Sequence, residues 1–179
     1  MKVVSVMAMS LNGKITRGEL PDNSGWQSRE DLEFFSTLLP KYDTRIMGRK
    51  TYLAQRDNLK HKQGLLRVIL TKNPDMYQNE AIDNMLEFSS ETPNELVDRM
   101  SLQQRNKILL LGGSEINGLF FNSNLVDQLY ITIEPILFGM GKPFASILEN
   151  ETKLKLLDSK QLNSQGTMLL HYQCLHNNS

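Results

Sequence analysis

The sequence contains little cysteine, no long apolar run and no excess of charge of either sign. A single cysteine cannot form an internal disulfide, which excludes a disulfide-stapled fold and suits a reducing compartment. Twenty basic residues balance twenty acidic ones, so the composition favours neither nucleic acid nor an anionic membrane as a partner. The apolar run that opens the chain, MKVVSVMAMS, is too short to span a bilayer and lacks a clear cleavage site. We therefore expect a cytoplasmic protein that does not associate with membranes.

The motifs of several common enzyme classes are also missing. The chain has no G-x-G-x-x-G after a strand, no Walker P-loop, no G-x-S-x-G elbow and no zinc-deaminase signature. His171, Cys174 and His176 lie close together in the sequence, but His171 and Cys174 point to opposite faces if this segment is a strand. We therefore predict no metal site there, and hydrolytic and metal-dependent chemistries lack their usual residues.

What the sequence does contain is a regular alternation of strand and helix patterns. A length of 179 residues with 40% hydrophobic residues predicts one domain, residues 1–179, with a substantial core. Short, β-branched apolar runs predict strands at residues 2–9, 44–47, 66–71, 108–111 and 129–137. Amphipathic patterns between them predict helices at residues 28–39, 49–55, 93–100 and about 114–122. This alternation indicates a largely parallel α/β sheet.

The C-terminal part departs from this alternation. The segments KLKLLDSKQL and TMLLHYQCL, separated by a turn at residues 163–166, predict an antiparallel hairpin at one edge of the sheet.

An acidic residue stands on the apolar face of the first predicted helix. Asp31, Phe34, Phe35 and Leu38 are spaced i, i+3, i+4 and i+7, so they share one face. Two interpretations remain open at this point. Ser28 and Asp31 resemble a shortened capping box in the first turn, or the acid serves a reaction at the edge of the core.

Three strand-to-helix junctions carry residues suited to phosphate. They are IMGRKTY (46–52), VILTK (68–72) and ILLLGGSE (108–115). Each follows a predicted parallel strand, and ligands of open α/β sheets collect at the carboxyl ends of strands. Cations and free N–H groups at a helix start would bind phosphate, and paired glycines would let a ligand approach the backbone closely. Ordinary turns with solvated charges are the alternative.

These segments together carry a family resemblance that covers residues 2 to 174. The order W-x4-D-L-x-x-F, IMGRKTY, VILT, LLGGSEI and LYIT resembles dihydrofolate reductase. The segments SLNGKI and LVDQLYITIEPILFGMGKPF are more similar to a relative of that enzyme, the reductase domain of riboflavin biosynthesis, which is the C-terminal domain of a bifunctional deaminase/reductase. That domain reduces a ribosylaminopyrimidine phosphate with NADPH.

The resemblance implies a dihydrofolate-reductase-like fold with a mixed, mostly parallel central sheet, flanking helices and an antiparallel C-terminal hairpin. It implies that Asp31 and Thr132 are catalytic, with the acid under the substrate ring and the threonine supporting it. The implied substrate-binding residues are Ala8, Asn12, Trp26, Phe35 and Glu115. The implied NADPH-binding residues are Gly48, Arg49, Lys50, Thr51, Leu70, Thr71, Lys72, Gly112, Gly113, Ser114 and Glu115. A cis peptide bond between Gly112 and Gly113 is implied as well.

The sequence thus leads us to expect an NADPH-dependent reductase of a pyrimidine- or pterin-like heterocycle. The ribosylaminopyrimidine phosphate is the first candidate substrate and dihydrofolate is the second. A nucleotide-binding protein without turnover is the alternative from another class. The resemblance also implies a homodimer.

Overall fold

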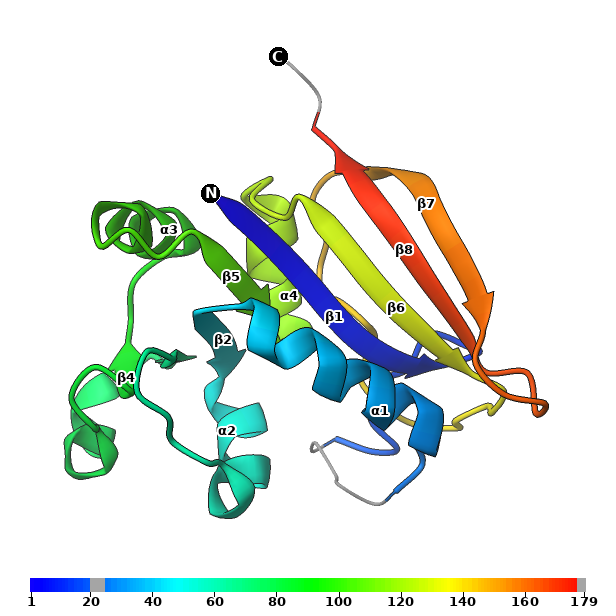
Figure 1. Ribbon diagram of the computed structural model, residues 1–179, viewed down its shortest axis with the longest axis horizontal. Helices are drawn as coiled ribbons and strands as arrows, with labels where there is room; N and C mark the ends of the chain where they lie inside the picture. The colour runs from blue at the N-terminus through cyan, green and yellow to red at the C-terminus, as the bar shows by residue number, and fades with distance from the viewer. Residues whose placement is uncertain (20–24, 177–179) are drawn as a thin grey trace.

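The computed structural model describes residues 1–19 and 25–176, which are built around an eight-stranded sheet (Figure 1). The strand order is β4-β3-β2-β5-β1-β6-β8-β7. The strands are β1 (Lys2–Ser10), β2 (Thr44–Gly48), β3 (Leu66–Leu70), β4 (Leu86–Ser89), β5 (Lys107–Leu110), β6 (Gln128–Glu134), β7 (Lys153–Gln161) and β8 (Met168–Leu175). Strands β1 to β6 run parallel, whereas β8 is antiparallel to β6 and β7 is antiparallel to β8. The predicted fold class is confirmed.

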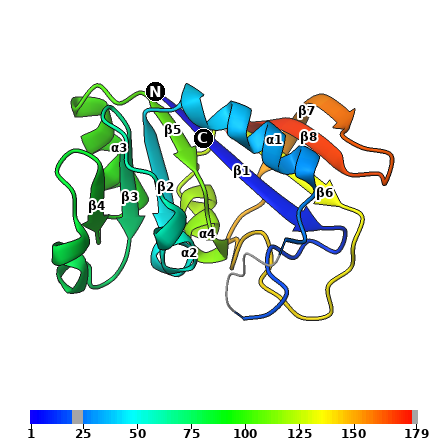
Figure 2. The same cartoon turned by 60° about the horizontal axis from the view of Figure 1, so that its bottom comes forward.

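Helices cover both faces of the parallel part of the sheet. They are α1 (Arg29–Leu38), α2 (Arg49–Gln55), α3 (Pro93–Leu102) and α4 (Ser114–Asn122). Leu38 of α1 packs on Val4, Val6 and Leu109, and α2 adds Tyr52 to a cluster on the same face. The side chains of α3 and α4 join the large cluster on the opposite face. Figures 1 and 2 show α1 and α4 on opposite sides of the sheet. No helix in the described ranges is long and apolar enough to cross a membrane.

The predicted elements agree with the structure except at two strands. The apolar pattern over 129–137 predicts too long a strand, because β6 ends at Glu134 and Pro135, which lacks an N–H donor, follows it. Strand β4 was not predicted, since its four residues, LEFS, include a glutamate and form too short an apolar run. The C-terminal hairpin is confirmed, with Gly166 at a φ of +98° in its turn.

The order in which the chain adds strands to the sheet reverses between the neighbouring strands β1 and β5, although the two strands run parallel. Strand β1 is followed by α1 on one face, and the chain then continues to β2. The neighbouring strand β5 is followed by α4 on the other face, and the chain then continues to β6. In open α/β sheets, ligands bind at the carboxyl ends of the strands beside such a switch point. A ligand is therefore expected to bind at the segments that follow β1, β2, β5 and β6.

Candidate active site

Asp31 is buried at the start of α1. Its side chain is 4% exposed, and its carboxylate oxygen Oδ2 accepts a hydrogen bond from Nε2 of Gln27 at 3.0 Å. A hydrogen bond with Thr132 of β6 also reaches this carboxylate. The register pairs Thr132 with Ala8 of β1, so the acid lies over the β1–β6 pair, next to the switch point. The sequence prediction that Asp31 shares the core-facing side of α1 with Leu38 is confirmed.

The structure separates the two interpretations of this acid. Ser28 is indeed the N-cap of α1, and its Oγ accepts the backbone N–H of Asp31 at 3.3 Å. In a complete capping box the acid would accept the N–H of the cap in return, as Glu95 does for Thr92 in α3 at 2.9 Å. Ser28 instead donates its N–H to Oε1 of Glu134 at 2.7 Å. The capping-box interpretation of Asp31 is therefore wrong in its second half, and the carboxylate serves no cap.

Glu134 is a second buried carboxylate, which the sequence analysis missed. It is 3% exposed and ends β6. Besides the Ser28 N–H, it accepts the Ser28 hydroxyl at 2.8 Å and the Thr167 hydroxyl at 2.7 Å. The strand pattern carries a sequence signal for this residue. Thr132 and Glu134 are two positions apart in β6, so both side chains point to the face that α1 covers. Glu134 thus ties the start of α1 to the sheet.

The surroundings of Asp31 favour its protonated form. Burial is the main cause and raises the pKa of the carboxyl above its ordinary value. The hydrogen bond from Thr132 opposes this shift, the charge of Glu134 adds to it, and the bond from Gln27 opposes it weakly. A carboxyl whose pKa is shifted upward can hold and release a proton closer to neutral pH than an ordinary aspartate can.

Aromatic and polar groups surround the two acids. The rings of Trp26 and Phe138 meet edge to face with centroids 5.2 Å apart. Phe35 is half-buried against the cluster under α1. Asn12, an expected substrate contact, uses its amide to hold the chain at Phe138, donating to its carbonyl at 2.7 Å and accepting its N–H at 3.1 Å. The substrate contacts of Ala8, Asn12, Trp26 and Phe35 stay predictions.

A hollow of about 350 Å³ lies beside this group. It is lined by side chains from the start of α1, the end of β6 and the turn between β7 and β8, including Trp26, Glu134 and Thr167. Glu134 therefore lies next to open space, whereas Asp31 does not line this hollow.

The junctions after β2 and β5 meet at the same edge of the sheet. The N–H of Gly48 donates to the carbonyl of Gly112 at 2.8 Å, and the N–H of Gly113 donates to Oγ1 of Thr51 at 3.0 Å. The expected cis peptide bond between Gly112 and Gly113 is present. Gly112 has a φ of +71°, and a Cβ atom there would lie 2.5 Å from Cε of Met7. The positive φ favours glycine at this position, and a side chain there would also displace the end of Met7.

Cations and an unused hydroxyl surround this turn. Arg49, Lys50 and Lys72 are exposed, and Lys50 reaches Oε1 of Glu115 at 3.1 Å. Ser114 Oγ, at the first position of α4, is buried and has no hydrogen-bond partner in the described part of the chain. Buried polar atoms ordinarily have a hydrogen-bond partner, and water or a ligand supplies it where the protein does not. Together with the cations, the Ser114 hydroxyl fits a polyanionic cofactor at the start of α4.

The junction after β3 lies further along the same edge. Leu70 ends that buried strand, and the N–H of Thr71 donates to the carbonyl of Ser89 at 2.9 Å. Because β3 pairs in parallel with β2, Thr71 and Lys72 stand beside the Gly48 junction. The structure thus brings the three predicted junctions together at the carboxyl ends of the strands. Their cofactor contacts stay predictions.

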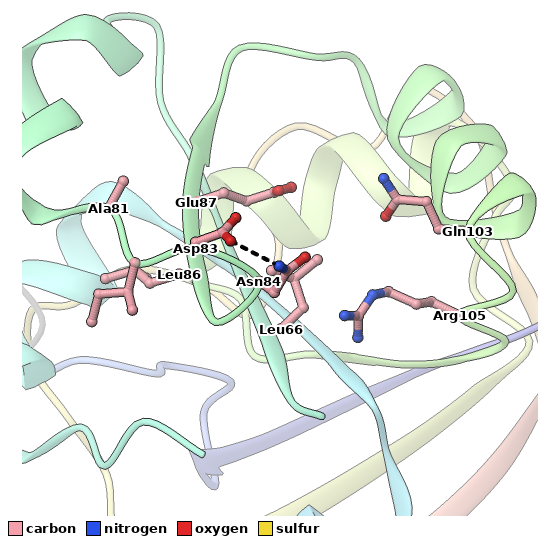
Figure 3. Close-up of a pocket in the computed structure, with 9 residues that line it drawn as sticks. Leu66, Ala81, Asp83, Asn84, Leu86, Glu87, Gln103 and Arg105 are labelled. Atoms are coloured by element: carbon pink, nitrogen blue, oxygen red, sulfur yellow. Dashed lines mark hydrogen bonds between the residues drawn. The ribbon is translucent and has the colours of Figure 1, made fainter. Parts of the chain in front are cut away.

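A larger hollow of about 620 Å³ lies elsewhere (Figure 3). It is lined by Leu66 and Leu86, which begin β3 and β4, and by Arg105, which precedes β5. These are the amino ends of the parallel strands, whereas Asp31 and the glycine turn lie at the carboxyl ends. Figure 3 shows Arg105 facing Asn84 across the hollow. This site lies apart from the acids and the cations described above.

Comparison with known proteins matches residues 1–168 to the family model of the RibD C-terminal domain. The protein YwjB of Bacillus subtilis (strain 168) is 29% identical over 185 residues, which span 96% of this chain and 97% of YwjB.

Two solved structures are similar along almost the whole chain. A pyrimidine reductase-like protein from Corynebacterium diphtheriae has a TM-score of 0.78 at 17% identity, with 98% of this chain and 92% of that chain covered. The diaminohydroxyphosphoribosylaminopyrimidine deaminase/5-amino-6-(5-phosphoribosylamino)uracil reductase of Thermotoga maritima has a TM-score of 0.70 at 18% identity. The match covers 97% of this chain and 56% of that one. At these identities, the two structures establish a shared fold.

Proposed function

Because the chain belongs to the RibD C-terminal domain family, we propose that it is an NADPH-dependent reductase of a pyrimidine-type heterocycle. The preferred candidate substrate is 5-amino-6-(5-phosphoribosylamino)uracil, on which the Thermotoga neighbour is named to act. The observation that carries the proposal is the buried carboxyl of Asp31, placed beside Thr132 at the edge that also holds the glycine turn.

The cofactor would lie along the ends of β2, β3 and β5. Arg49 and Lys50 at the start of α2 and Lys72 after β3 are exposed cations suited to its phosphates. Ser114 Oγ and the free N–H groups of the first turn of α4 would take up the remaining phosphate oxygens. Glycine at position 112 allows close approach of the backbone. A reduced nicotinamide bound there would supply the hydride.

The side chains around Asp31 would align and protonate the substrate ring. The carboxyl, with its raised pKa, would hydrogen-bond ring nitrogens and donate or accept a proton there. Thr132 would fix the orientation of this carboxyl through its hydrogen bond. The buried setting excludes water from the acid and so strengthens its interactions with the ring. The homodimer that the resemblance implies and the cytoplasmic location that the composition predicts both stay predictions.

Cofactor preference tests the proposed binding edge. If Arg49, Lys50 or Lys72 contacts the additional phosphate that distinguishes NADPH from NADH, NADPH binds at least about tenfold more tightly, because one charge-assisted contact contributes about 1.5–3 kcal/mol. Calorimetric titration of both cofactors measures this difference. The variants Arg49→Gln and Lys72→Gln should reduce it, whereas Lys155→Gln on the exposed strand β7 should not. Equal affinities for the two cofactors in the wild type contradict the assignment of this edge.

A further inference from the structure

The helix that carries Asp31 is held to the sheet differently at its two ends. Two side chains of α1 are buried, Asp31 in the first turn and Leu38 in the last. Leu38 packs in an apolar cluster together with Phe34 and Phe35, so apolar contacts hold the later turns of the helix. Leu32, the residue after Asp31, is 48% exposed. The first turn therefore depends on another kind of connection to the sheet.

Open space adjoins this first turn. The hollow of about 350 Å³ lies between the start of α1, the end of β6 and the turn between β7 and β8, and its lining includes Ser28, Glu30, Glu134, Asn163 and Thr167. Because side chains do not fill this space, apolar packing cannot hold the helix start against the C-terminal hairpin. Hydrogen bonds between the lining residues make the connection instead.

Glu134 makes the connection to the sheet. Its Oε1 accepts the N–H of Ser28 at 2.7 Å and the Ser28 hydroxyl at 2.8 Å, and that hydroxyl oxygen accepts the N–H of Asp31 at 3.3 Å. Two hydrogen bonds thus join the Glu134 carboxylate to the backbone of Asp31. No ion pair among residues 1–19 and 25–176 includes Glu134. A buried charge without a cation costs stability, which indicates a role beyond fastening one helix.

The turn between β7 and β8 completes the connection. The hydroxyl of Thr167, a residue that is 1% exposed, donates to Oε2 of Glu134 at 2.7 Å. Asn163 donates from Nδ2 to the Thr167 hydroxyl at 3.0 Å and to Oε2 of Glu30, in the first turn of α1, at 3.1 Å. Its Oδ1 accepts the N–H of Thr167 at 3.1 Å, which fixes the turn itself. The hairpin therefore reaches the first turn of α1 by two routes, one through Glu134 and one through Glu30.

We propose that Glu134, Thr167 and Asn163 are positioning residues for Asp31, so that the C-terminal hairpin acts on the reaction through the start of α1. The proposal rests on the proposed function, because Asp31 is the group assigned there to align and protonate the substrate ring. A catalytic group has to be held within about 0.5 Å of its productive position, and a displacement of about 1 Å can lower a rate about 10²-fold. The three residues fix the backbone that carries this group.

Thr167→Val and Asn163→Ala test the proposal without changing any charge. Valine keeps the size of Thr167 but removes the hydrogen bond to Glu134 and the acceptor for Asn163. With 5-amino-6-(5-phosphoribosylamino)uracil as substrate, we expect single-turnover oxidation of NADPH to slow about ten- to hundredfold in Thr167→Val, the effect of a displaced catalytic group. NADPH affinity should not change, because the proposed cofactor edge lies at the ends of β2, β3 and β5.

Asn122→Ala is the matched control for Asn163→Ala. Asn122 ends α4 and also fastens a loop, because it donates to the carbonyl of Ile147 at 3.0 Å and accepts the N–H of Glu149 at 3.0 Å. Its replacement should lower the melting temperature much as Asn163→Ala does, and should leave the single-turnover rate unchanged. Wild-type rates in both Thr167→Val and Asn163→Ala would show that the hairpin is only structural and would overturn the proposal.

Amide hydrogen exchange reports on the helix start without substrate or cofactor. Glu134→Gln keeps the size of the side chain and an oxygen that can accept the Ser28 N–H, whereas Glu134→Leu removes every acceptor. We expect the protection of the Ser28 and Asp31 N–H groups to fall at least about tenfold in Glu134→Leu, the loss of a charge-assisted hydrogen bond, and to stay near the wild-type value in Glu134→Gln. Thr167→Val should lower the same protection. Helix α3, which packs on the opposite face, should keep its protection in all three variants.

The proposed function and the positioning role fail in different ways. If no heterocycle is reduced but Glu134→Leu and Thr167→Val still lose protection at Ser28 and Asp31, the reductase assignment is wrong and the positioning of Asp31 stands. If the wild type reduces the pyrimidine and protection is unchanged in both variants, the positioning role is refuted and the reductase assignment stands. If Glu134→Leu does not fold, Thr167→Val decides both measurements, because it exchanges neutral side chains of similar size.

Discussion

Replacing Asp31 with asparagine separates a mechanistic acid from a structural one. The Ser28 hydroxyl caps α1 and Glu134 accepts the Ser28 N–H, so the cap does not depend on the Asp31 carboxylate. Asparagine keeps the shape of the side chain and can still accept the hydrogen bond that Gln27 now donates. It cannot titrate, and its NH₂ group presents donors where a carboxylate presents acceptors.

The expected effects on rate and on stability differ in size. A positioned acid or base contributes about 10²- to 10⁴-fold to a rate, which corresponds to about 2.7–5.5 kcal/mol of activation free energy. The stability change should stay within about 1 kcal/mol, the net value of one altered hydrogen bond. The pKa of Asp31 is higher in the folded protein than in the unfolded chain. The protonated carboxyl therefore stabilises the folded state at pH values below the unfolded pKa, and this contribution disappears as the pH rises through the folded pKa. The asparagine side chain does not ionise, so the Asp31→Asn variant should lose no stability over that interval.

The assay is single-turnover oxidation of NADPH across a pH series, together with thermal unfolding of the same samples. We expect slower turnover in Asp31→Asn, loss of the titration that a raised carboxyl pKa gives the wild type, and similar melting temperatures. Glu33→Gln is the matched control, because Glu33 is an exposed acid on the same helix that pairs with the exposed Arg29 at 2.7 Å. Normal turnover by Asp31→Asn, or an unchanged pH profile, refutes the role assigned to this acid.

Three further perturbations test separate parts of the structure. Gly112→Ala should destabilise the protein by about 1–3 kcal/mol in urea unfolding, because φ is +71° and its Cβ would meet Met7, whereas Gly139→Ala, with open space around it, should change little. Glu134→Gln should lower the pKa of Asp31, because the charge of Glu134 raises that pKa. The limb of the pH–rate profile that reports Asp31 should then move to lower pH, and a limb that does not move contradicts the coupling between the two acids. Burial and the charge of Asp127 raise the pKa of Cys174 to about 11. Iodoacetamide at about pH 8 should therefore label this thiol only in the unfolded protein, and rapid labelling of the native protein contradicts this expectation.

The sequence pattern predicted the elements of the fold where local signals agree with packing. The buried runs that became β1, β2, β3 and β5 are continuous because helices cover both faces of the sheet. The capping residues Ser28 and Thr92 marked the starts of α1 and α3 to within a residue. Strand β4 escaped prediction because a four-residue edge strand owes its conformation to pairing with β3 and not to its own pattern.

The site was predictable only in part, because some of its residues interact across long sequence separations. The three strand-to-helix junctions could be found, since each carries its own local sequence pattern. Glu134 shares a strand face with Thr132, but this pattern does not reveal its role, which depends on Ser28, 106 residues away, and on Thr167, 33 residues away.

The most direct test of the reductase assignment follows the transferred hydrogen itself. NADPH carrying deuterium at the reactive carbon of the nicotinamide is incubated with the protein and 5-amino-6-(5-phosphoribosylamino)uracil, and the product is analysed by mass spectrometry, with dihydrofolate tested in parallel. We predict deuterium in the reduced product of this pyrimidine substrate and a much lower yield in Asp31→Asn. Transfer only to dihydrofolate would show a folate reductase instead. Tight binding of NADPH without deuterium in any product would contradict the account and leave a nucleotide-binding protein.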